Sequence, residues 1–450
     1  MASVSTSALC LASCVLALTT GCRLRYDAQD GGADALRGLD APGLDAPDRD
    51  APDLDAADRD APDLDASRDA PAPRCGDGVV DPGEACDGED LDGLDCTTVA
   101  AGLRGGVLGC LADCSAFDVA GCTPGDTVVA ASCSLTDVST AVALAADGDT
   151  VQIPAGSCTW TNPTPGSPAL QIDDRRLVLR GAGEALTTIG DDGGLTFGDT
   201  LIVFGGATRA PARVTGITFR RSRAEEGAAH LIAFFGGREN WRVDHCTFEM
   251  ESIHGFVHTD GPRSGLVDHV TVRGRAHVWA YGSFADVDAR WREPLALGTR
   301  SATYVEDSSF DDRLDSGHHT TGAVYADFAA RLVFRRNAVR DAPLGFQGPT
   351  LTRGSFSYEI YENTFVAETS SWTWLELGGG AGVVWGNRAS GGWARFVVLD
   401  YVRSCEARVD GLCDGTSPLD GNLEPDGYPC RDQHGRSTDG PSGQALEGLY

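Results

Sequence analysis

The phrase Val243-Asp244-His245-Cys246-Thr247-Phe248 decides the fold, because it recurs with drift through the second half of the chain. Each version consists of an apolar residue, any residue and a second apolar residue, followed by a polar residue or glycine and often, soon after, by an aromatic residue. We call the polar residue or glycine at which the chain should bend the pivot. The pivots are Gly216, His245, His269, Asp307, Asn337, Asn363 and Asn387, at intervals of 24 to 38 residues. Self-similarity in this range predicts a solenoid, in which each repeat buries its apolar face against its neighbours.

The repeat is a β unit. Apolar residues alternate over short runs rich in Val, Ile, Tyr and Phe, and Gly, Asn and Asp punctuate these runs. The same three residue types suit a left-handed bend at each corner, and stacked Asn amides can form a ladder along the axis. We therefore expect an all-β domain, a right-handed parallel β-helix over residues 126–400. A capping helix should precede it, with Thr136 as N-cap and Val138, Val142 and Ala145 on one face.

Two stretches carry a resemblance to a known family. The segment Asn240-Trp241-Arg242-Val243-Asp244-His245-Cys246 resembles the rung phrase of the pectate-lyase-like β-helix superfamily. Residues 133–156 resemble the start of that fold, with a short helix, the turn Asp147-Gly148 and a strand that ends in Pro154-Ala155-Gly156. The resemblance implies a protein that binds a linear polysaccharide, as a lyase, a hydrolase or a non-catalytic binding solenoid. The Arg-x-Pro-x-x-Arg signature of pectate lyases is absent from the sequence.

The N-terminal residues predict export. Residues 1–21 are small and apolar, as in a secretory signal peptide, and Leu18-Thr19-Thr20-Gly21-Cys22 resembles a lipobox, which implies lipidation of Cys22. Residues 22–74 form a linker rich in Asp, Ala and Pro, which cannot bury enough surface to fold. We expect a monomer anchored by its lipid to the bacterial outer membrane or cell surface. The formal net charge of −30 argues against nucleic acid as a partner.

Residues 75–122 predict a small disulfide-rich module. The phrase from Cys75 to Asp87 resembles a myxobacterial-type cysteine-rich surface repeat, and so small a segment with few large apolar residues needs disulfides to fold. Sequence does not choose the pairing. The candidate cysteines of the module are Cys75, Cys86, Cys96, Cys110, Cys114 and Cys122. Outside it, Cys133 with Cys158 and Cys413 with Cys430 are candidate pairs, the second within residues 401–450, a C-terminal cap or tail.

The sequence predicts no certain cofactor, and calcium is the one candidate that it offers. Its carboxylate ligands could come from Asp77, Asp81, Glu84 and Asp87 in the module, where plain surface acidity is the alternative. Because the chain contains no Lys, Schiff-base chemistry and a lysine base are excluded.

A row of rings is expected on one face of the solenoid. The segments after successive corners should stack into one sheet and lift His, Trp and Tyr side chains as a ladder suited to a sugar chain. The candidate substrate-binding residues are His258, Trp279, Tyr281, Trp291 and Trp374. The alternative is that half of these side chains point inward and pack.

The densest ionisable cluster follows the longest interval between pivots. It offers carboxylates for Ca²⁺ or acid catalysis and imidazoles as bases near neutral pH, and an ordinary charged turn is the equal alternative. The candidate catalytic residues are Asp312, Asp315, His318 and His319, with Arg335 near them. If the chain is an enzyme, we expect a polysaccharide lyase or glycoside hydrolase. The rival is a non-catalytic carbohydrate-binding or adhesion solenoid.

Overall fold

The computed structural model describes residues 75–399, apart from 82, 165, 192–198, 207–209, 222–229, 262–263, 284–289, 291–292, 313–321 and 347–353, and two short strands, β29 (Arg436–Thr438) and β30 (Ala445–Glu447). The side chains of residues 251–254, 275, 369–372, 436–438 and 445–447 are not described. The predicted signal peptide, the linker, Cys22 and the pair Cys413 with Cys430 lie outside the described residues.

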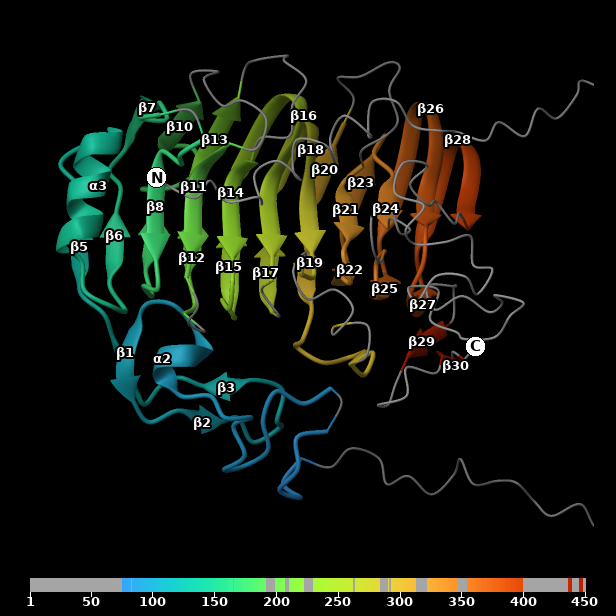
Figure 1. Ribbon diagram of the computed structural model, residues 1–450, viewed down its shortest axis with the longest axis horizontal. Helices are drawn as coiled ribbons and strands as arrows, with labels where there is room; N and C mark the ends of the chain where they lie inside the picture. Colours follow the sequence, from blue (N-terminus) through green and yellow to red (C-terminus); the bar gives the residue numbers. More distant parts are fainter. Residues whose placement is uncertain are drawn as a thin grey trace, which may run out of the picture.

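The predicted parallel β-helix is confirmed, and each of its coils passes through three faces (Figure 1). The first face is a ten-stranded parallel sheet. Its strands are β5 (Thr127–Val129), β6 (Thr150–Gln152), β9 (Val178–Arg180), β12 (Arg213–Thr215), β15 (Trp241–Asp244), β17 (Gly265–Asp268), β19 (Thr303–Glu306), β22 (Arg331–Arg335), β25 (Ser357–Tyr361) and β27 (Ala381–Trp385).

The second and third faces are two halves of one fourteen-stranded sheet. Four long strands run through both halves: β16 (Thr247–Asp260), β18 (Thr271–Tyr281), β26 (Thr364–Leu377) and β28 (Arg388–Leu399). The second face adds β7 (Gly156–Trp160), β10 (Thr187–Asp191), β13 (Thr218–Arg221), β20 (Ser309–Asp311) and β23 (Ala338–Arg340). The third face adds β8 (Leu170–Asp173), β11 (Thr200–Gly205), β14 (His230–Phe235), β21 (Val324–Asp327) and β24 (Leu344–Phe346).

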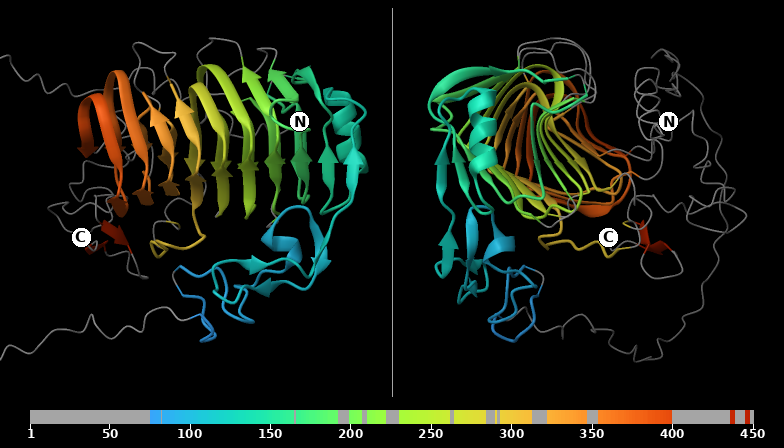
Figure 2. Two further views of the ribbon diagram at one scale, coloured as in Figure 1. Left: turned by 180° about the vertical axis from the view of Figure 1, so that it is seen from behind. Right: turned by 60° about the vertical axis from the view of Figure 1, so that its left-hand side comes forward.

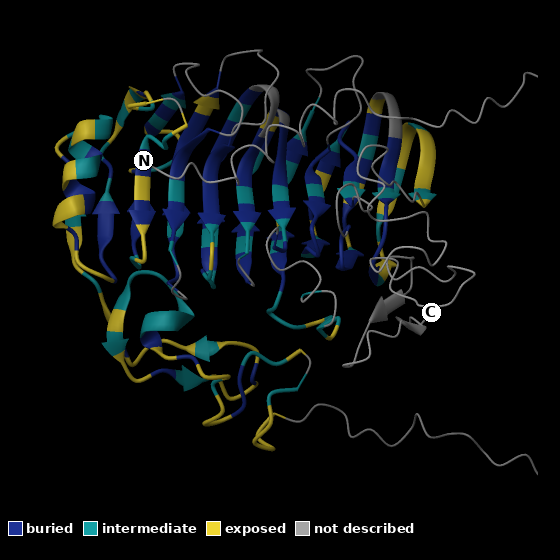
Figure 3. Cartoon of the chain, viewed as in Figure 1, coloured by how far each residue is buried: buried dark blue, intermediate teal, exposed yellow. Residues whose placement is uncertain are grey.

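The core is a set of apolar side chains stacked in register along the axis. Figure 3 shows the strands as predominantly buried. Alternation along each strand places every second side chain inside, and fully burying one of these aliphatic side chains contributes about 1.5–3 kcal/mol. The inward positions of the third face include Leu170, Ile202, Ile232, Val257, Val278, Val324, Leu344 and Leu375, which are 0 to 4% exposed.

From β12 onward, the corner from the first face to the second contains one residue in the left-handed conformation. These residues are Gly216, His245, His269, Asp307, Arg336, Glu362 and Gly386, with φ between 48° and 71°. In the first four coils they coincide with the predicted pivots. In the last three the prediction was one residue late, because the asparagines follow the bend and turn inward.

The inward asparagines form the predicted amide ladder. The Nδ2 of Asn363 donates to Phe334 O (2.8 Å) and to Oδ1 of Asn387 (2.9 Å), while its Oδ1 accepts from the backbone N of Asn337 (2.9 Å). Asn337 and Asn363 are 2% and 1% exposed. The ladder thus satisfies buried backbone and amide groups from one coil to the next.

A helix caps the N-terminal end of the core. It is α3 (Leu135–Leu144), and its buried residues include Val138, Ala141 and Val142. Its N-cap is Ser134, whose Oγ accepts from Asp137 N (3.2 Å); the prediction of Thr136 was therefore wrong by two residues. A disulfide between Cys133 and Cys158 joins the start of this cap to β7.

At the other end the last described coil is open. Its side chains include Phe396, Val397 and Leu399, which are 61%, 46% and 66% exposed.

The cysteine-rich module lies beside the β-helix (Figure 2). It consists of α2 (Cys96–Val99) and two small antiparallel sheets, β1 (Leu103–Gly106) with β4 (Cys122–Pro124) and β2 (Gly109–Cys110) with β3 (Phe117–Asp118). Disulfide bonding is confirmed, and the pairs are Cys75–Cys114, Cys86–Cys110 and Cys96–Cys122.

Polar contacts hold the module against the corner between the third and first faces. Asn240 donates to Thr98 O (2.8 Å), and Arg300 pairs with Asp92 (2.7 Å). The module is therefore packed on the β-helix. No helix among the described residues has the length and apolar character needed to cross a membrane.

Candidate functional site

The third face carries a row of outward side chains that follows the axis. Strand pairing places Ala233, His258, Trp279, Tyr325, Gly345 and Glu376 opposite one another on successive coils. Each lies next in sequence to an inward residue of the core, so alternation turns it to the outer surface. Neighbouring members of the row lie at the strand spacing of about 4.8 Å.

The aromatic rings of this row are in contact. His258 stacks on Trp279 with ring centroids 5.7 Å apart, and Trp279 meets Tyr325 edge-on at 5.4 Å. The ring centroids of His230 and His258 are 4.2 Å apart. The ring of His277 lies 5.5 Å from that of Trp279. We name His230, His258, His277, Trp279, Tyr281 and Tyr325 the ring cluster.

Gly255 makes room for the cluster. A Cβ at this position would lie 2.5 Å from Nδ1 of His230 and 3.5 Å from the Cβ of Trp279. The glycine therefore lets the imidazole of His230 reach the next coil, where a larger residue would displace it.

Several nitrogens of the cluster are buried without a hydrogen-bond partner in the described part of the chain. They are Nδ1 and Nε2 of His258 and Nδ1 of His277. A buried donor or acceptor left unsatisfied costs about 1–3 kcal/mol. Such groups are uncommon in native proteins, and a ligand is one reason to retain them.

Burial also fixes the charge of the cluster. Desolvation, with a smaller contribution from His277, lowers the pKa of His258 to about 3, and desolvation lowers the pKa of His277 to about 4. Both imidazoles are therefore neutral at physiological pH. Desolvation also raises the pKa of Tyr325 well above its usual value, and the carboxylates of Asp327 and Glu376 add to this shift. The phenol consequently keeps its proton and can donate a hydrogen bond.

The structure thus brings together three of the five predicted substrate-binding residues, His258, Trp279 and Tyr281. Trp291 lies outside the described residues. Trp374 is only 6% exposed and its ring packs 4.8 Å from that of Phe365 in the core. The prediction of Trp374 as an outward stacking plane is therefore wrong, because its ring faces the interior where β26 passes from the second face to the third.

The predicted catalytic cluster is only partly described. Asp315, His318 and His319 lie outside the described residues, so their role stays a prediction. Asp312 follows β20 on the second face, where its backbone N donates to Arg340 O (3.0 Å).

Arg335 ends β22 on the first face, where its guanidinium contacts Glu306 and the hydroxyl of Tyr361. Asp312 follows a strand of the second face, so the two residues belong to different faces. A joint role of Arg335 with the predicted cluster stays a prediction.

Three members of the ring cluster, His230, His277 and Tyr325, were not among the predicted binding residues. His277 lies two residues before Trp279 in the same strand, β18, and Tyr325 is paired with Trp279 from the neighbouring strand β21, a relation that becomes visible only from the strand register. His230 begins β14, and strict alternation would place it inside with Ile232 and Phe234, so the sequence offered no signal for its place in the cluster.

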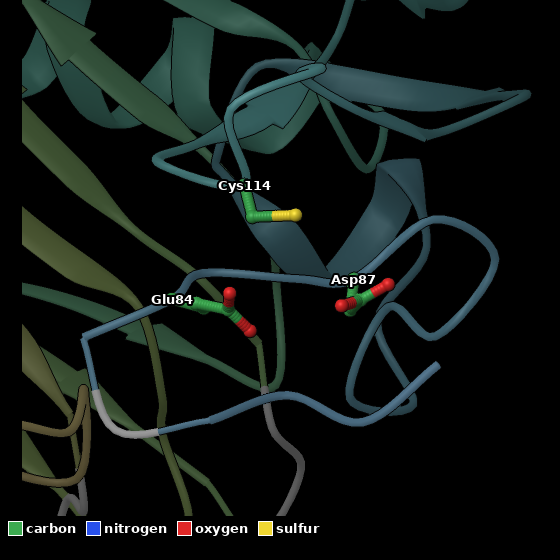
Figure 4. A group of neighbouring side chains, drawn as sticks. All are labelled: Glu84, Asp87 and Cys114. Atoms are coloured by element: carbon green, nitrogen blue, oxygen red, sulfur yellow. The ribbon is translucent and has the colours of Figure 1, made fainter. Parts of the chain in front are cut away.

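The predicted calcium ligands of the module are engaged in turns. Figure 4 shows Glu84 and Asp87 beside Cys114. The carboxylate of Asp87 accepts hydrogen bonds from the backbone N of residues 76, 77 and 78, and Glu84 accepts from Asp81 N. The sulfur of Cys114 is bonded to that of Cys75. The acidic groups are thus already used to hold the loop, and calcium binding there stays a prediction.

Comparisons with known proteins give a fold likeness only. No protein-family model matches the chain, and no curated protein matches it. Among solved structures, an alginate lyase from Paenibacillus sp. str. FPU-7 is similar, with 11% sequence identity over 62% of this chain and 99% of that chain, and a TM-score of 0.34. Values this low carry no argument about the chemistry of this chain.

Proposed function

We propose that the β-helix binds a polysaccharide along the outer surface of its third face. The observation that carries the proposal is the row of His258, Trp279 and Tyr325, whose rings follow one another from coil to coil beside unpartnered ring nitrogens. Sugar rings offer apolar faces that pack on aromatic side chains, and hydroxyls that can satisfy buried donors and acceptors. A repeated row along a rigid axis suits a repeated, linear ligand.

Cleavage of the bound polymer is the second candidate function. The observation that favours it is the proximity of the Tyr325 phenol to the carboxylates of Asp327 and Glu376. A pair of carboxylates flanking a glycosidic bond supports hydrolysis. A neutral imidazole or a phenol near the bond could instead exchange a proton with a uronate, as a lyase requires.

The decisive experiment measures binding and cleavage over a panel of neutral, amino-sugar and uronate polysaccharides. Trp279→Ala should weaken binding of the best ligand about tenfold, because a lost aromatic contact of about 1.4 kcal/mol corresponds to that factor. Release of reducing ends and absorbance of unsaturated uronates would report hydrolysis and elimination respectively.

The matched control is Trp385→Ala, which removes an exposed tryptophan from the first face. It should leave affinity unchanged. Equal affinity of the Trp279→Ala variant and the parent, at equal melting temperature, would refute the proposed binding face.

We also propose that the protein is exported and held at the cell surface by a lipid on Cys22. The four disulfides between residues 75 and 158 support an oxidising compartment. In this arrangement the polysaccharide is the ligand, and contact with the membrane is made through the lipid anchor alone.

A further inference from the structure

The charged side chains of the third face share one sign. From β8 to β26 this face is formed by β8, β11, β14, β21 and β24 and by residues 255–260, 276–281 and 373–377 of the long strands. In these described segments the chain has no Arg, and the charged residues are Asp173, Asp260, Asp327 and Glu376. The second face differs, because its carboxylates alternate with arginines, as in the pair of Arg220 with Glu249 (2.6 Å).

Three of these carboxylates lie beside the ring cluster. Strand pairing places Asp260 and Asp327 on either side of Tyr281. It places Glu376 in the row of Tyr325, two coils further along. Desolvation is the largest cause of the raised pKa of both phenols, and the carboxylates add to it, Asp327 at both rings. The rings therefore lie in the field of these carboxylates.

The carboxylates can accept further hydrogen bonds. Oδ1 of Asp327 accepts from Phe328 N (2.7 Å), and all three carboxylates make other polar contacts as well. An ionised carboxylate has about four lone-pair sites, so a donor group of a ligand would add to these contacts. At the corner beyond Tyr281, the guanidinium groups of Arg290 and Arg331 donate to the carbonyl oxygens of Gly261 and Pro294.

The imidazoles of the cluster supply further acceptors. With pKa values of about 3 and about 4, His258 and His277 are neutral at physiological pH. A neutral imidazole has one N–H and one nitrogen with a lone pair. Because neither nitrogen of His258 has a partner among the described residues, one unpartnered lone pair is present whichever tautomer it adopts. Nδ1 of His277, a residue 3% exposed, is unpartnered in the same part of the chain.

These groups together favour a ligand with positive charge. The faces of Trp279 and Tyr325 attract cations through their ring quadrupoles. An ammonium group has three hydrogen-bond donors and no acceptor, so it fits both the carboxylates and the imidazole lone pair. We propose that the third face selects a polysaccharide of amino sugars whose amino groups are free and protonated. This inference rests on the proposed function and specifies its ligand.

The same groups disfavour a polyuronate. Such a polymer carries a carboxylate on each sugar, and a ligand carboxylate near Asp327 and Glu376 would meet charges of its own sign. The chain contains no Lys. The described third-face segments up to β26 contain no Arg either, so they offer no side-chain cation to neutralise a uronate.

The test is calorimetric titration of the full-length protein with three short oligosaccharides of equal length, at physiological ionic strength. They are a glucosamine oligomer, its N-acetylated form and an oligouronate. We expect the glucosamine oligomer to bind most tightly. Glu376→Gln should weaken its binding about tenfold, the factor that corresponds to a lost hydrogen bond between charged groups. The same variant should change binding of the N-acetylated oligomer much less.

Glu362→Gln is the matched control, because it removes the same charge from an exposed corner between the first and second faces. It should leave all affinities unchanged. The control is needed since a chain of formal net charge −30 attracts polycations in general. Equal loss of affinity in Glu376→Gln and Glu362→Gln would overturn the proposal.

Trp279→Ala distinguishes this proposal from the binding face on which it rests. If the N-acetylated oligomer or the oligouronate binds most tightly and Trp279→Ala weakens that binding, the face binds polysaccharide but the charge selection is overturned. If Trp279→Ala changes none of the affinities, the binding face itself is refuted. Melting temperatures of the variants close to that of the parent exclude unfolding as the cause of a loss.

Discussion

Arg238 holds several turns of the chain together through one side chain. The residue is fully buried, and its guanidinium donates to four carbonyl oxygens, those of Ile172, Arg175, Gly205 and Ala210. Desolvation lowers its pKa to about 10, so it remains charged at neutral pH. A planar group with five donors can bond in several directions at once, and a lysine ammonium cannot reproduce this pattern.

The histidines of the ring cluster should make stability depend on pH. When the chain unfolds, His258 and His277 return to an ordinary pKa near 6.5 and take up protons that the folded chain does not bind until pH falls to about 3 and about 4. Stability should therefore fall as pH decreases from about 6.5 toward 4, by a few kcal/mol in total. Urea unfolding midpoints at pH 7 and pH 5 measure this slope.

The comparison variant is His258→Phe with His277→Phe, which keeps the rings and removes the titration. Its midpoint should change less between the two pH values than that of the parent. Equal changes in both proteins would show that other groups control the acid sensitivity.

Among the structural elements, the asparagine ladder is the best defined contributor to stability. Asn363→Ala removes an amide that bonds to Phe334 O and Asn387 Oδ1 and accepts from Asn337 N. Because these partners stay buried without replacement, unfolding free energy should fall by about 3 kcal/mol. Chemical denaturation measures the change. Glu362→Gln, at the adjacent exposed corner residue, is the control and should change stability little.

The order of the strands could be predicted because alternation and a recurrent corner are local properties of the sequence. The residue that takes the left-handed bend in the last three coils could not be predicted. Asn suits both a left-handed bend and an inward ladder, and the structure gives the bend to Arg336 and Glu362, residue types with no preference for positive φ.

The candidate site was predictable to the extent that it follows the strand register. His258 and Trp279 occupy equivalent positions of neighbouring strands, which the repeat itself indicates. Trp374 was misplaced because a strand that continues through a corner changes which side its residues face. Distance along the chain does not tell which of the three faces a residue occupies, so the sequence could not place Arg335 on the first face and Asp312 on the second.

At the scale of the whole molecule, the module and the β-helix are joined by side-chain contacts as well as by the chain. Two contacts connect segments about 140 to 210 residues apart in sequence: the ion pair of Arg300 with Asp92 and the hydrogen bond from Asn240 to Thr98 O. The predicted linker, residues 22–74, ends directly before Cys75, the first residue of this packed module. A lipid at the far end of the linker would therefore tether the whole assembly through the module.

A lipid on Cys22 predicts that the protein is found in the membrane fraction of the cell. Cys22→Ala should release the protein from the membrane fraction into the soluble exported fraction, because no thiol remains to carry the lipid. Fractionation followed by detection of the protein measures the release. Cys14→Ala, in the predicted signal peptide, is the control and should leave the protein with the membranes. Membrane association of the Cys22→Ala variant would indicate a different anchor.

From β12 to β28, the corner between the first and second faces has the same short form in every coil, a left-handed residue followed by one inward residue, whereas the distance between successive corners varies by up to fourteen residues. One extra residue at this corner would exchange the inside and outside of the strand that follows it. Length variation in evolution should accordingly collect at the other two corners. For protein engineering, insertions should accordingly be tolerated better at those two corners than between a left-handed residue and the strand that follows it.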